Sequence, residues 1–386
     1  MIRKSFLRNT KLEQLTSNKW ELPSIGTKNI GFGICPKSGL VMQSPSPTPN
    51  QIQTYYETAA TYINPGRDGK PSLEKVKVLD RMINYTISSI GLIPKSIFQV
   101  GCSNGYTLNR FREAGATFTT GIDPSIASHD LAKRLYNIET IIGSFEDYND
   151  KSNKYDLFIL THVLEHLFNP IDTLRKCNDM QNDDGWILIE VPLFERMDLF
   201  GPGIFTLEHL NYFSEKTLIE TVTRSGYEVI FSTKYFFHHE YPVITIIARK
   251  DPNVNIIKSN DYNRSSVLAI NYINQEKKSW EKIEQKIKER VDLSSSIYIY
   301  GAGIHTSQLL AYTDIKETFN IIGLLDSSST KWGKNIGKYN CYNINEININ
   351  ENDIFLISSY ASENEIFKFL VKNYNNKIVR LYGDKT

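Results

Sequence analysis

Two short segments of the sequence carry residues that could bind a nucleotide-like ligand. In the first, Gln99-Val100-Gly101-Cys102-Ser103-Asn104-Gly105, an apolar run passes into a turn of small residues. Gly101 and Gly105 allow the backbone to approach a ligand closely, and amides at a helix start can hold a carboxylate or phosphate. The second is Asp123, which ends the next apolar run and could accept hydrogen bonds from both ribose hydroxyls. The pair indicates a cofactor site more strongly than either segment alone.

A third segment, His162-Val163-Leu164-Glu165-His166, spells the HxxEH signature of some metallopeptidases. That chemistry needs the motif on a helix together with a third ligand. Here the motif directly follows an apolar strand-like run, so we favour a structural interpretation, in which Glu165 and His166 hydrogen-bond and fix the loop. The sequence therefore predicts no metal site.

The composition indicates a globular protein and argues against several classes of function. Lys and Arg total 44 and Asp and Glu 43, so the basic excess typical of nucleic-acid binding is absent. The sequence shows neither an apolar run of the roughly 18–20 residues that cross a bilayer nor a secretory signal. Its cysteines form no CxxC pair, which suits a reducing compartment. We expect a cytoplasmic protein without nucleic-acid or membrane partners.

Residues 95–250 alternate apolar, β-rich runs with helical patterns, which predicts a doubly wound, mainly parallel sheet. A helix over Leu73–Ile90 is expected to lead into it, because apolar residues recur there at helical spacing. The last two runs follow each other too closely for an intervening helix and are expected as an antiparallel pair at the sheet edge. The predicted strands are Ser96–Val100, Phe118–Ile122, Thr140–Ile142, Tyr155–Leu160, Trp186–Val191, Tyr227–Thr233 and Tyr241–Ala248.

The remaining chain divides into three further segments. Residues 1–92 look irregular, and their proline-rich part favours an extended or turn-rich path. Residues 251–294 read as a polar linker and a long helix over Ser265–Val291. Residues 295–386 restart the alternating pattern and predict a second, smaller Rossmann-like α/β domain. The predicted fold class is therefore α/β throughout, with residues 93–250 as the larger doubly wound domain.

The motifs of residues 93–250 resemble, in the correct order, those of class I S-adenosylmethionine-dependent methyltransferases: VGCSNG, GIDPS, IIGSFED, YDLFILTHVLEHLFNP and GWILIEVP. The resemblance implies S-adenosyl-L-methionine as cofactor and S-adenosylhomocysteine as product. This chain departs from the family at Gln99, where an acidic residue is usual, and at Ser103, where glycine is usual. Gln99 keeps a hydrogen-bond acceptor but loses a charge. The implied cofactor residues are Gln99, Gly101, Cys102, Ser103 and Gly105 for the methionine part, Asp123 for the ribose, Ser144 and Phe145 for the adenine, and Thr161 and His162 on the sulfonium side.

A second resemblance concerns the acceptor of the methyl group. Phe205–Ser214 is similar to the EHxxYFS segment of methyltransferases that act on nucleotide-linked sugars. Those proteins also have an N-terminal region like SGLVMQSPSPTP…YY and a C-terminal Rossmann-like domain like YGAGIHTSQLL…LLDSSSTKWG. The likeness implies that residues 1–92 form a substrate or cap region. It also implies that the nucleotide lies between the two α/β domains, near Gly301 and Gly303. Alternatively, these glycines serve only strand-to-helix packing.

We expect O-methylation, with His209 as general base, because imidazole titrates near neutral pH. Glu208 is expected to orient His209 or to bind a neighbouring sugar hydroxyl. The alternative for His209 is a hydrogen bond to substrate or a satisfied loop position. The residues expected to bind substrate or close its pocket are Tyr55, Tyr56, His166, Tyr212, His238, Gly301 and Gly303.

The predicted function is methylation of a hydroxyl on a nucleotide-linked sugar, such as a GDP-heptose or deoxysugar, for a bacterial capsule or surface polysaccharide. One alternative is C-methylation of a keto-sugar, but that subgroup binds zinc through four N-terminal cysteines and this chain has only Cys35 there. Another alternative is a cofactor-binding module without catalysis, in which Gln99 and Ser103 mark the loss. A monomer or homodimer fits either assignment.

Overall fold

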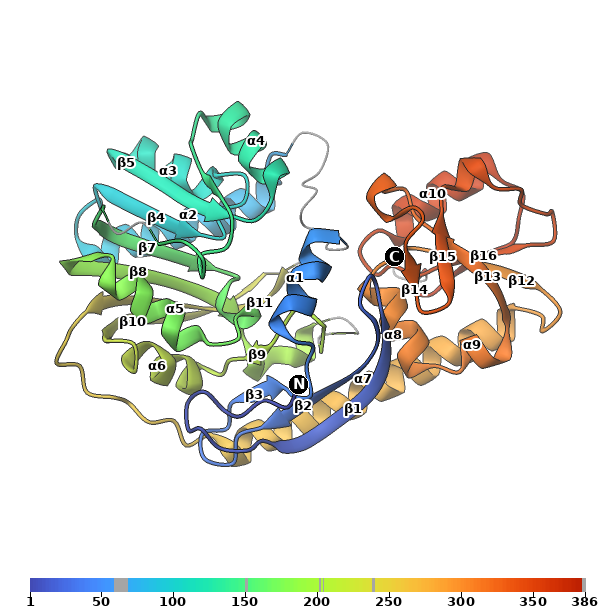
Figure 1. The fold of residues 1–386 in the computed structure, drawn as a ribbon, viewed down its shortest axis with the longest axis horizontal. Coiled ribbons are helices and arrows are strands. Elements are labelled where there is room, and N and C mark those ends of the chain that lie inside the picture. The colour runs from blue at the N-terminus through green and yellow to red at the C-terminus, as the bar shows by residue number, and fades with distance from the viewer. Residues whose placement is uncertain (59–68, 150–151, 201–202, 204, 238–239, 384–386) are drawn as a thin grey trace.

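The computed structural model of this protein describes residues 1–58, 69–149, 152–200, 203, 205–237 and 240–383 (Figure 1). The described strands form three sheets, one in the N-terminal region, one central and one C-terminal. No helix among the described residues has the length and apolar character needed to cross a membrane.

The central sheet has seven strands in the order β10-β11-β8-β7-β4-β5-β6. Strands β4, β5, β6, β7 and β8 are parallel, whereas β11 runs antiparallel to β8 and β10 antiparallel to β11. The predicted antiparallel edge pair is therefore confirmed. The strands are β4 (Ser96–Val100), β5 (Phe118–Asp123), β6 (Ile141–Ile142), β7 (Tyr155–Thr161), β8 (Gln181–Pro192), β10 (Tyr227–Phe237) and β11 (Glu240–Lys250).

Alternate residues of each central strand face opposite sides of the sheet, as the pleat requires. Phe98 and Phe158 belong to one apolar cluster, and their neighbours Ile97 and Leu157 belong to another. Helices that cover the sheet bury both clusters, so these strands read as continuous apolar runs. The helices are α2 (Leu73–Ile90), α3 (Tyr106–Ala114), α4 (Ile126–Tyr136), α5 (Pro170–Asp179) and α6 (Glu215–Thr223), with the short helices η2 (Leu164–His166) and η3 (Phe194–Leu199).

Helix α2 spans the predicted residues because its ends are strongly marked in the sequence. Ser72 caps the first turn by accepting a hydrogen bond from the amide of Lys75 (3.2 Å). Gly91 ends the helix in the left-handed region, which glycine adopts without a steric penalty.

The prediction that residues 1–92 are irregular is wrong. They contribute three strands to an antiparallel sheet with the order β1-β2-β3-β9, whose last strand comes from the methyltransferase-like region. Strand β1 is largely exposed and polar and β2 is rich in glycine, so the local β signal is weak. Burial of Trp20 and Phe32 on the inner face stabilises the sheet instead. The elements are β1 (Glu13–Leu22), β2 (Gly26–Ile34), β3 (Val41–Gln43), β9 (Asn211–Tyr212) and α1 (Pro49–Thr58).

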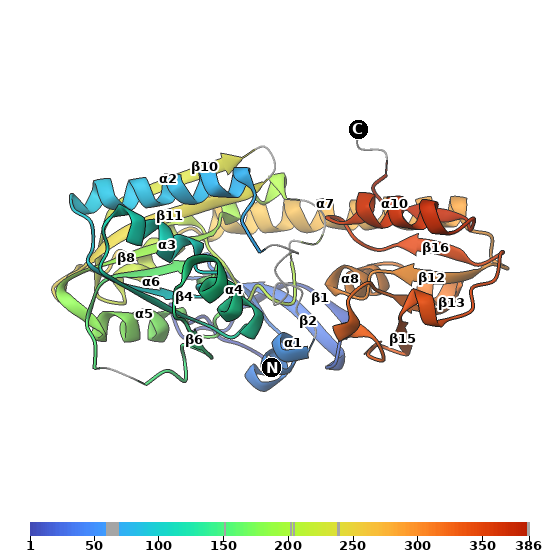
Figure 2. The ribbon, with the colours of Figure 1, turned by 90° about the horizontal axis from the view of Figure 1, so that it is seen from above.

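The long helix α7 (Tyr262–Arg290) runs from the central sheet's lobe to the C-terminal lobe (Figure 2). The C-terminal sheet has the order β14-β15-β13-β12-β16-β17 and is parallel except for β14 against β15. A second, smaller α/β unit is therefore present, as predicted. Its elements are β12 (Ser296–Tyr300), α8 (Ile304–Tyr312), α9 (Ile315–Thr318), β13 (Asn320–Leu325), η4 (Ser329–Lys331), β14 (Asn335–Ile336), β15 (Tyr339–Tyr342), η5 (Ile344–Glu346), β16 (Ile354–Ile357), α10 (Glu363–Asn373) and β17 (Ile378–Arg380).

Candidate active site

The carboxyl ends of β4, β5 and β7 meet at one edge of the central sheet, because these strands are parallel neighbours. In doubly wound sheets this edge is where ligands bind. Asp123 ends β5, and its carboxylate accepts hydrogen bonds from the amides of Ser103 and Ser125, each at 2.9 Å. The carboxylate thereby holds together the loops that follow β4 and β5. Burial raises the pKa of Asp123 against the lowering effect of these two hydrogen bonds.

The surroundings of Gln99 and Gly101 indicate whether S-adenosylmethionine could bind at this edge of the sheet. The Gln99 side chain is 3% exposed, and its Oε1 accepts no hydrogen bond from any residue that the structure describes. A buried acceptor without a donor is costly, and a ligand ammonium would satisfy it. Gly101 has φ +67°, and a Cβ there would lie 2.8 Å from Val163 Cγ2, so its backbone conformation and its packing both favour glycine. The unpartnered oxygen of Gln99 is the feature that fits the methionine part of the cofactor.

The other predicted cofactor residues lie around the same edge with different roles. Phe145 packs its ring against Phe98 (5.7 Å between centroids) in the apolar core, and its carbonyl accepts a hydrogen bond from Lys176 (2.7 Å). The Ser144 hydroxyl donates to Glu146 (2.9 Å). Cys102 is buried, and burial raises the pKa of its thiol, while Thr161 ends β7.

Two residues of this edge are held in the left-handed region of backbone conformation, Ser103 at φ +46° and His162 at φ +56°. Residues with a Cβ adopt this region at a cost, and such strain often clusters at functional sites. The conformation explains why glycine suits the position of Ser103.

We expect Ser103→Gly to raise the free energy of unfolding by up to about 1 kcal/mol, because the left-handed conformation costs a serine roughly 1–2 kcal/mol and glycine loses part of that gain in chain entropy. Urea unfolding measures the change. Ser128→Gly, in the first turn of α4, is the matched control and should be destabilising instead. Equal effects of the two substitutions would contradict the assignment of strain to Ser103.

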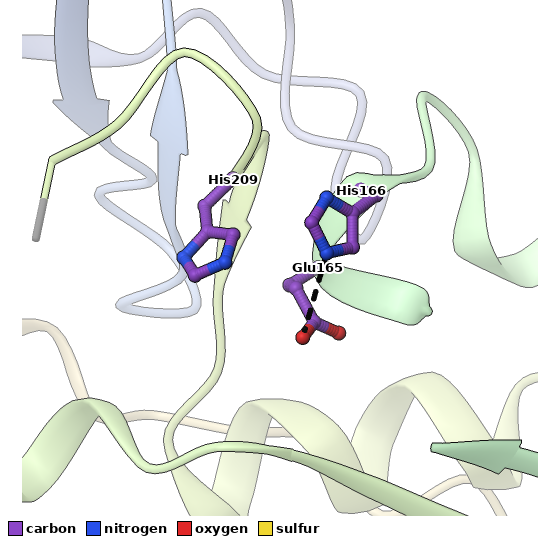
Figure 3. Close-up of side chains that lie close together, drawn as sticks. All are labelled: Glu165, His166 and His209. Carbon is purple, nitrogen blue, oxygen red and sulfur yellow. Dashed lines mark ion pairs between the residues drawn. The ribbon is translucent and has the colours of Figure 1, made fainter. Parts of the chain in front are cut away.

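A second group of polar side chains follows β7. Glu165, His166 and His209 each offer one ligand atom, and these atoms lie within 4.8 Å of one another (Figure 3). His166 Nε2 is 3.8 Å from Glu165 Oε1, and the His166 and His209 rings meet edge to face at 5.0 Å. All three residues stand out in the sequence, but no motif joins Glu165 to His209.

The loop that carries His209 is fastened by residues far away in the sequence. The amide of Leu210 donates to the carbonyl of Glu165 (2.7 Å), and Arg3 donates from Nη1 to the carbonyl of Leu210 (2.8 Å). Gln43 donates from Nε2 to the carbonyl of Thr206 (2.9 Å). Sequence reasoning missed Arg3 and Gln43, because neither lies in a motif and both contacts span more than 150 residues.

Helix α1 places two tyrosines over the same group. Tyr55 donates its hydroxyl proton to Glu208 Oε1 (2.6 Å), and the Tyr56 hydroxyl lies 3.2 Å from His166 Nδ1. Glu208 is therefore held by Tyr55, a contact that the sequence did not suggest. Burial raises the pKa of Tyr55, and the neighbouring Glu208 carboxylate raises it further. Tyr212 is buried, and its hydroxyl accepts from the amide of Thr206 (3.2 Å); His238 lies outside the described residues.

The His209 ring is neutral at physiological pH. Burial lowers its pKa to about 3, the nearby His166 lowers it as well, and the Glu165 carboxylate opposes them. A neutral imidazole keeps a lone pair that can accept a proton or bind a metal ion. Burial also raises the pKa of Glu165, but the adjoining histidines outweigh it and leave that pKa lowered, so the carboxylate is charged.

A cavity of about 440 Å³ lies between η3, α7 and the C-terminal unit. Its volume falls in the usual range for small-molecule sites. Its lining residues are Leu199, Phe200, Tyr272, Gln275, Glu276, Ser279, Lys282, Ile283, Tyr360 and Tyr382.

The predicted nucleotide contacts Gly301 and Gly303 do not line this cavity. Gly301 has φ +117°, and a Cβ there would lie 2.5 Å from the carbonyl oxygen of Ser358. Packing of β12 against β16 therefore accounts for Gly301. The carboxylate of Asp326 accepts from the amide of Ala302 (2.9 Å) and pairs with Lys331 (2.8 Å), so it is already engaged within the loop.

We expect the stability of the protein to depend on pH through Glu276. Burial raises the pKa of Glu276 to about 8, although contacts with Gly203 and Trp280 oppose the shift. The folded protein then holds a proton that the unfolded chain releases above pH 4.5. This contribution to stability is complete below that pH and is lost as the pH rises toward 8. Glu276→Gln should therefore match the wild type near pH 4.5 and become the more stable form at higher pH, by about 1.4 kcal/mol per pH unit.

Urea unfolding of both proteins at several pH values measures this difference. Glu281→Gln, at an exposed position on the same helix, is the matched control and should show no comparable gain. A Glu276→Gln protein whose stability relative to the wild type does not change with pH would rule out a protonated Glu276.

Comparison with known families assigns the two α/β units separately. Residues 80–231 match a family model described as a methyltransferase domain, and residues 293–379 match one described as C2185-like, N-terminal. The ubiquinone biosynthesis O-methyltransferase of Shewanella pealeana is 29% identical over 147 residues, covering 36% of this chain and 60% of the relative. The tRNA U34 carboxymethyltransferase of Saccharophagus degradans is 23% identical over 241 residues, covering 56% of this chain and 71% of the relative. The chain thus spans about 60% of the length of the Shewanella relative that it matches.

Solved structures with a similar fold include two methyltransferases. The 1,6-didemethyltoxoflavin-N1-methyltransferase of Burkholderia thailandensis has a TM-score of 0.44 and 14% identity, over 57% of this chain and 96% of its own. The N-methyltransferase NodS of Bradyrhizobium japonicum, in complex with S-adenosylhomocysteine, has a TM-score of 0.41 and 11% identity, over 51% of this chain and 97% of its own. The family match agrees with the motifs of the sequence, since residues 80–231 match a methyltransferase domain.

Proposed function

We propose that this protein transfers a methyl group from S-adenosylmethionine to a hydroxyl of a nucleotide-linked sugar. The observation that carries the proposal is that Glu165 and His166 follow β7, the strand beside β4, and are joined there by His209 from the loop before β9. A cofactor bound at the carboxyl ends of β4 and β5 is therefore next to side chains suited to a polar acceptor. S-adenosylmethionine supplies an electrophilic methyl group on a sulfonium and leaves as S-adenosylhomocysteine.

The residues at the carboxyl ends of β4 and β5 are assigned to bind and orient the cofactor. We assign the ribose to Asp123 and the ammonium to Gln99, whose unpartnered oxygen is buried beside the loop. The backbone around Gly101 allows close approach to the methionine part. These assignments follow the pattern of class I methyltransferases and use hydrogen-bond acceptors that the fold leaves available to a ligand.

The acceptor hydroxyl must lose a proton as the methyl group moves, and His209 is our candidate for receiving it at a ring nitrogen. Its neutral state leaves a lone pair available. Tyr55 and Tyr56, above Glu208 and His166, would exclude water from the acceptor. An oxygen acceptor also agrees with the O-methyltransferase activity named for the Shewanella relative.

The C-terminal unit contributes to a cavity whose chemistry favours a nucleotide-linked sugar as the acceptor of the methyl group. The cavity between η3, α7 and this unit combines Tyr360 and Tyr382 with Lys282. Aromatic rings suit a nucleobase and a lysine ammonium suits a phosphate. We assign the nucleotide to this cavity in place of the loop around Gly301.

Mass spectrometry tests the proposal. The purified protein is incubated with S-adenosylmethionine and a panel of GDP-, dTDP- and UDP-linked sugars, with and without the protein. A gain of one methyl group on a sugar is the expected result, and tandem spectra then distinguish oxygen from carbon as the acceptor. Cofactor binding without methylation of any member would reject nucleotide-linked sugars of these classes as substrates.

A further inference from the structure

The Glu165 carboxylate is buried and has only long contacts with its neighbours. Its side chain is 2% exposed, and neither oxygen accepts a well-formed hydrogen bond from the residues that the structure describes. His162 Nδ1 lies 3.5 Å and His166 Nε2 3.8 Å from Glu165 Oε1. A buried carboxylate is stabilised by a close cation, and a metal ion at this position would be one.

The hydrogen bonds of His166 show which of its nitrogens faces the carboxylate. His166 Nδ1 lies 3.0 Å from the carbonyl oxygen of Glu208, which can only accept, so we place the ring proton on Nδ1. In the neutral ring, Nε2 then directs a lone pair toward Glu165, so the imidazole and the carboxylate could both bind one cation placed between them. This arrangement, with the outer nitrogen held by a backbone carbonyl, is also the one that orients a metal-binding histidine.

We propose that Glu165, His166 and His209 bind one divalent transition-metal ion. Two imidazoles and one carboxylate suit ions such as Zn²⁺, Co²⁺ or Fe²⁺, whereas Mg²⁺ prefers an all-oxygen set. Ligand atoms around such an ion lie about 3–4 Å apart, so the observed separations of up to 4.8 Å require only a small rotation of the side chains. This proposal departs from the sequence-based expectation that no metal is bound.

Three protein ligands leave coordination positions for water or for an acceptor oxygen. An acceptor hydroxyl bound there would be more acidic, and His209 would then act as a ligand instead of the base. This role rests on the proposed function, but the binding of the ion does not.

Cobalt binding tests the inference with a readout independent of catalysis. The untagged full-length chain is treated with a chelator, dialysed and titrated with Co²⁺ while its visible absorption is recorded. We expect d–d bands that saturate at one Co²⁺ per chain and disappear when Zn²⁺ is added. Glu165→Gln and His166→Gln should each weaken Co²⁺ binding by about 100-fold or more, since loss of even an outer partner of a metal ligand costs about 10–100-fold.

His129→Gln is the matched control, because His129 is also half-buried but hydrogen-bonds Thr140 away from this group; it should bind Co²⁺ like the wild type. Circular dichroism establishes that each variant is folded, and His209→Asn replaces any variant that is not. Absence of saturable bands, or equal binding by the wild type and Glu165→Gln, would overturn the metal site. If no metal site is found but the chelator-treated protein still transfers methyl groups, the proposed function stands without the metal. If Co²⁺ binds but no sugar is methylated, the proposed function is rejected and the metal site is retained.

Discussion

His209→Ala is expected to lower kcat for methyl transfer by about 10²–10⁴-fold, the usual contribution of a positioned acid or base. The ring lies beside His166 on the loop fastened to Glu165, and no described residue hydrogen-bonds its side chain in a structural role. Replacing His209 therefore removes the group that receives the proton of the substrate hydroxyl, or removes a ligand of the metal ion. It does not disturb the edge of the central sheet where we place the cofactor. Single-turnover rates with saturating S-adenosylmethionine measure the loss.

The affinity for S-adenosylmethionine, measured by calorimetry on the same variant, should stay close to that of the wild type. His129→Ala serves as a control for the removal of a half-buried imidazole elsewhere in the domain. An unchanged kcat in His209→Ala would exclude His209 from the chemistry, and a parallel loss of cofactor affinity would indicate a structural role instead.

Asp123→Ala is expected to weaken S-adenosylmethionine binding by about 100-fold or more. The carboxylate holds the loops after β4 and β5 through the amides of Ser103 and Ser125, and we assign its remaining acceptor positions to the ribose. A hydrogen bond to a charged group is worth about 1.5–3 kcal/mol, so loss of the ribose contacts alone approaches the stated effect. Isothermal titration calorimetry with S-adenosylhomocysteine provides the measurement.

Asp156→Ala is the matched control at the opposite edge of the same sheet. Asp156 accepts hydrogen bonds from the amides of Lys95 (2.8 Å) and Ser96 (2.9 Å), the same kind of backbone contact that Asp123 makes. Its removal should lower stability but leave cofactor affinity intact. Equal losses of affinity in the two variants would show that Asp123 acts only through the fold.

Much of the fold could be predicted because the signals are local. The apolar runs around Phe98, Phe158 and Ile187 mark strands buried on both faces, and Ser72 and Gly91 mark the ends of α2. The N-terminal sheet could not be predicted, because β3 pairs with β9 across about 170 residues of chain and the polar strand β1 lacks a clear alternation.

The candidate site could likewise be predicted only in part. Gly101 and Ser103 follow β4 and Asp123 ends the neighbouring parallel strand β5, so the motif spacing alone brings them to one edge of the sheet. The pairing of Tyr55 with Glu208 and the approach of His209 to Glu165 depend on contacts between distant segments, which no local pattern encodes.

The sequence by itself determined the two α/β units, since these follow from hydrophobic periodicity, and its motifs implied the methyltransferase domain and the cofactor through their resemblance to a known family. Only the tertiary structure decided the surroundings of His209 and Glu165. The charge state of a buried group depends on desolvation and on every charge packed around it. Those neighbours come from helix α1, the segment after β7 and the loop before β9, which folding alone brings together.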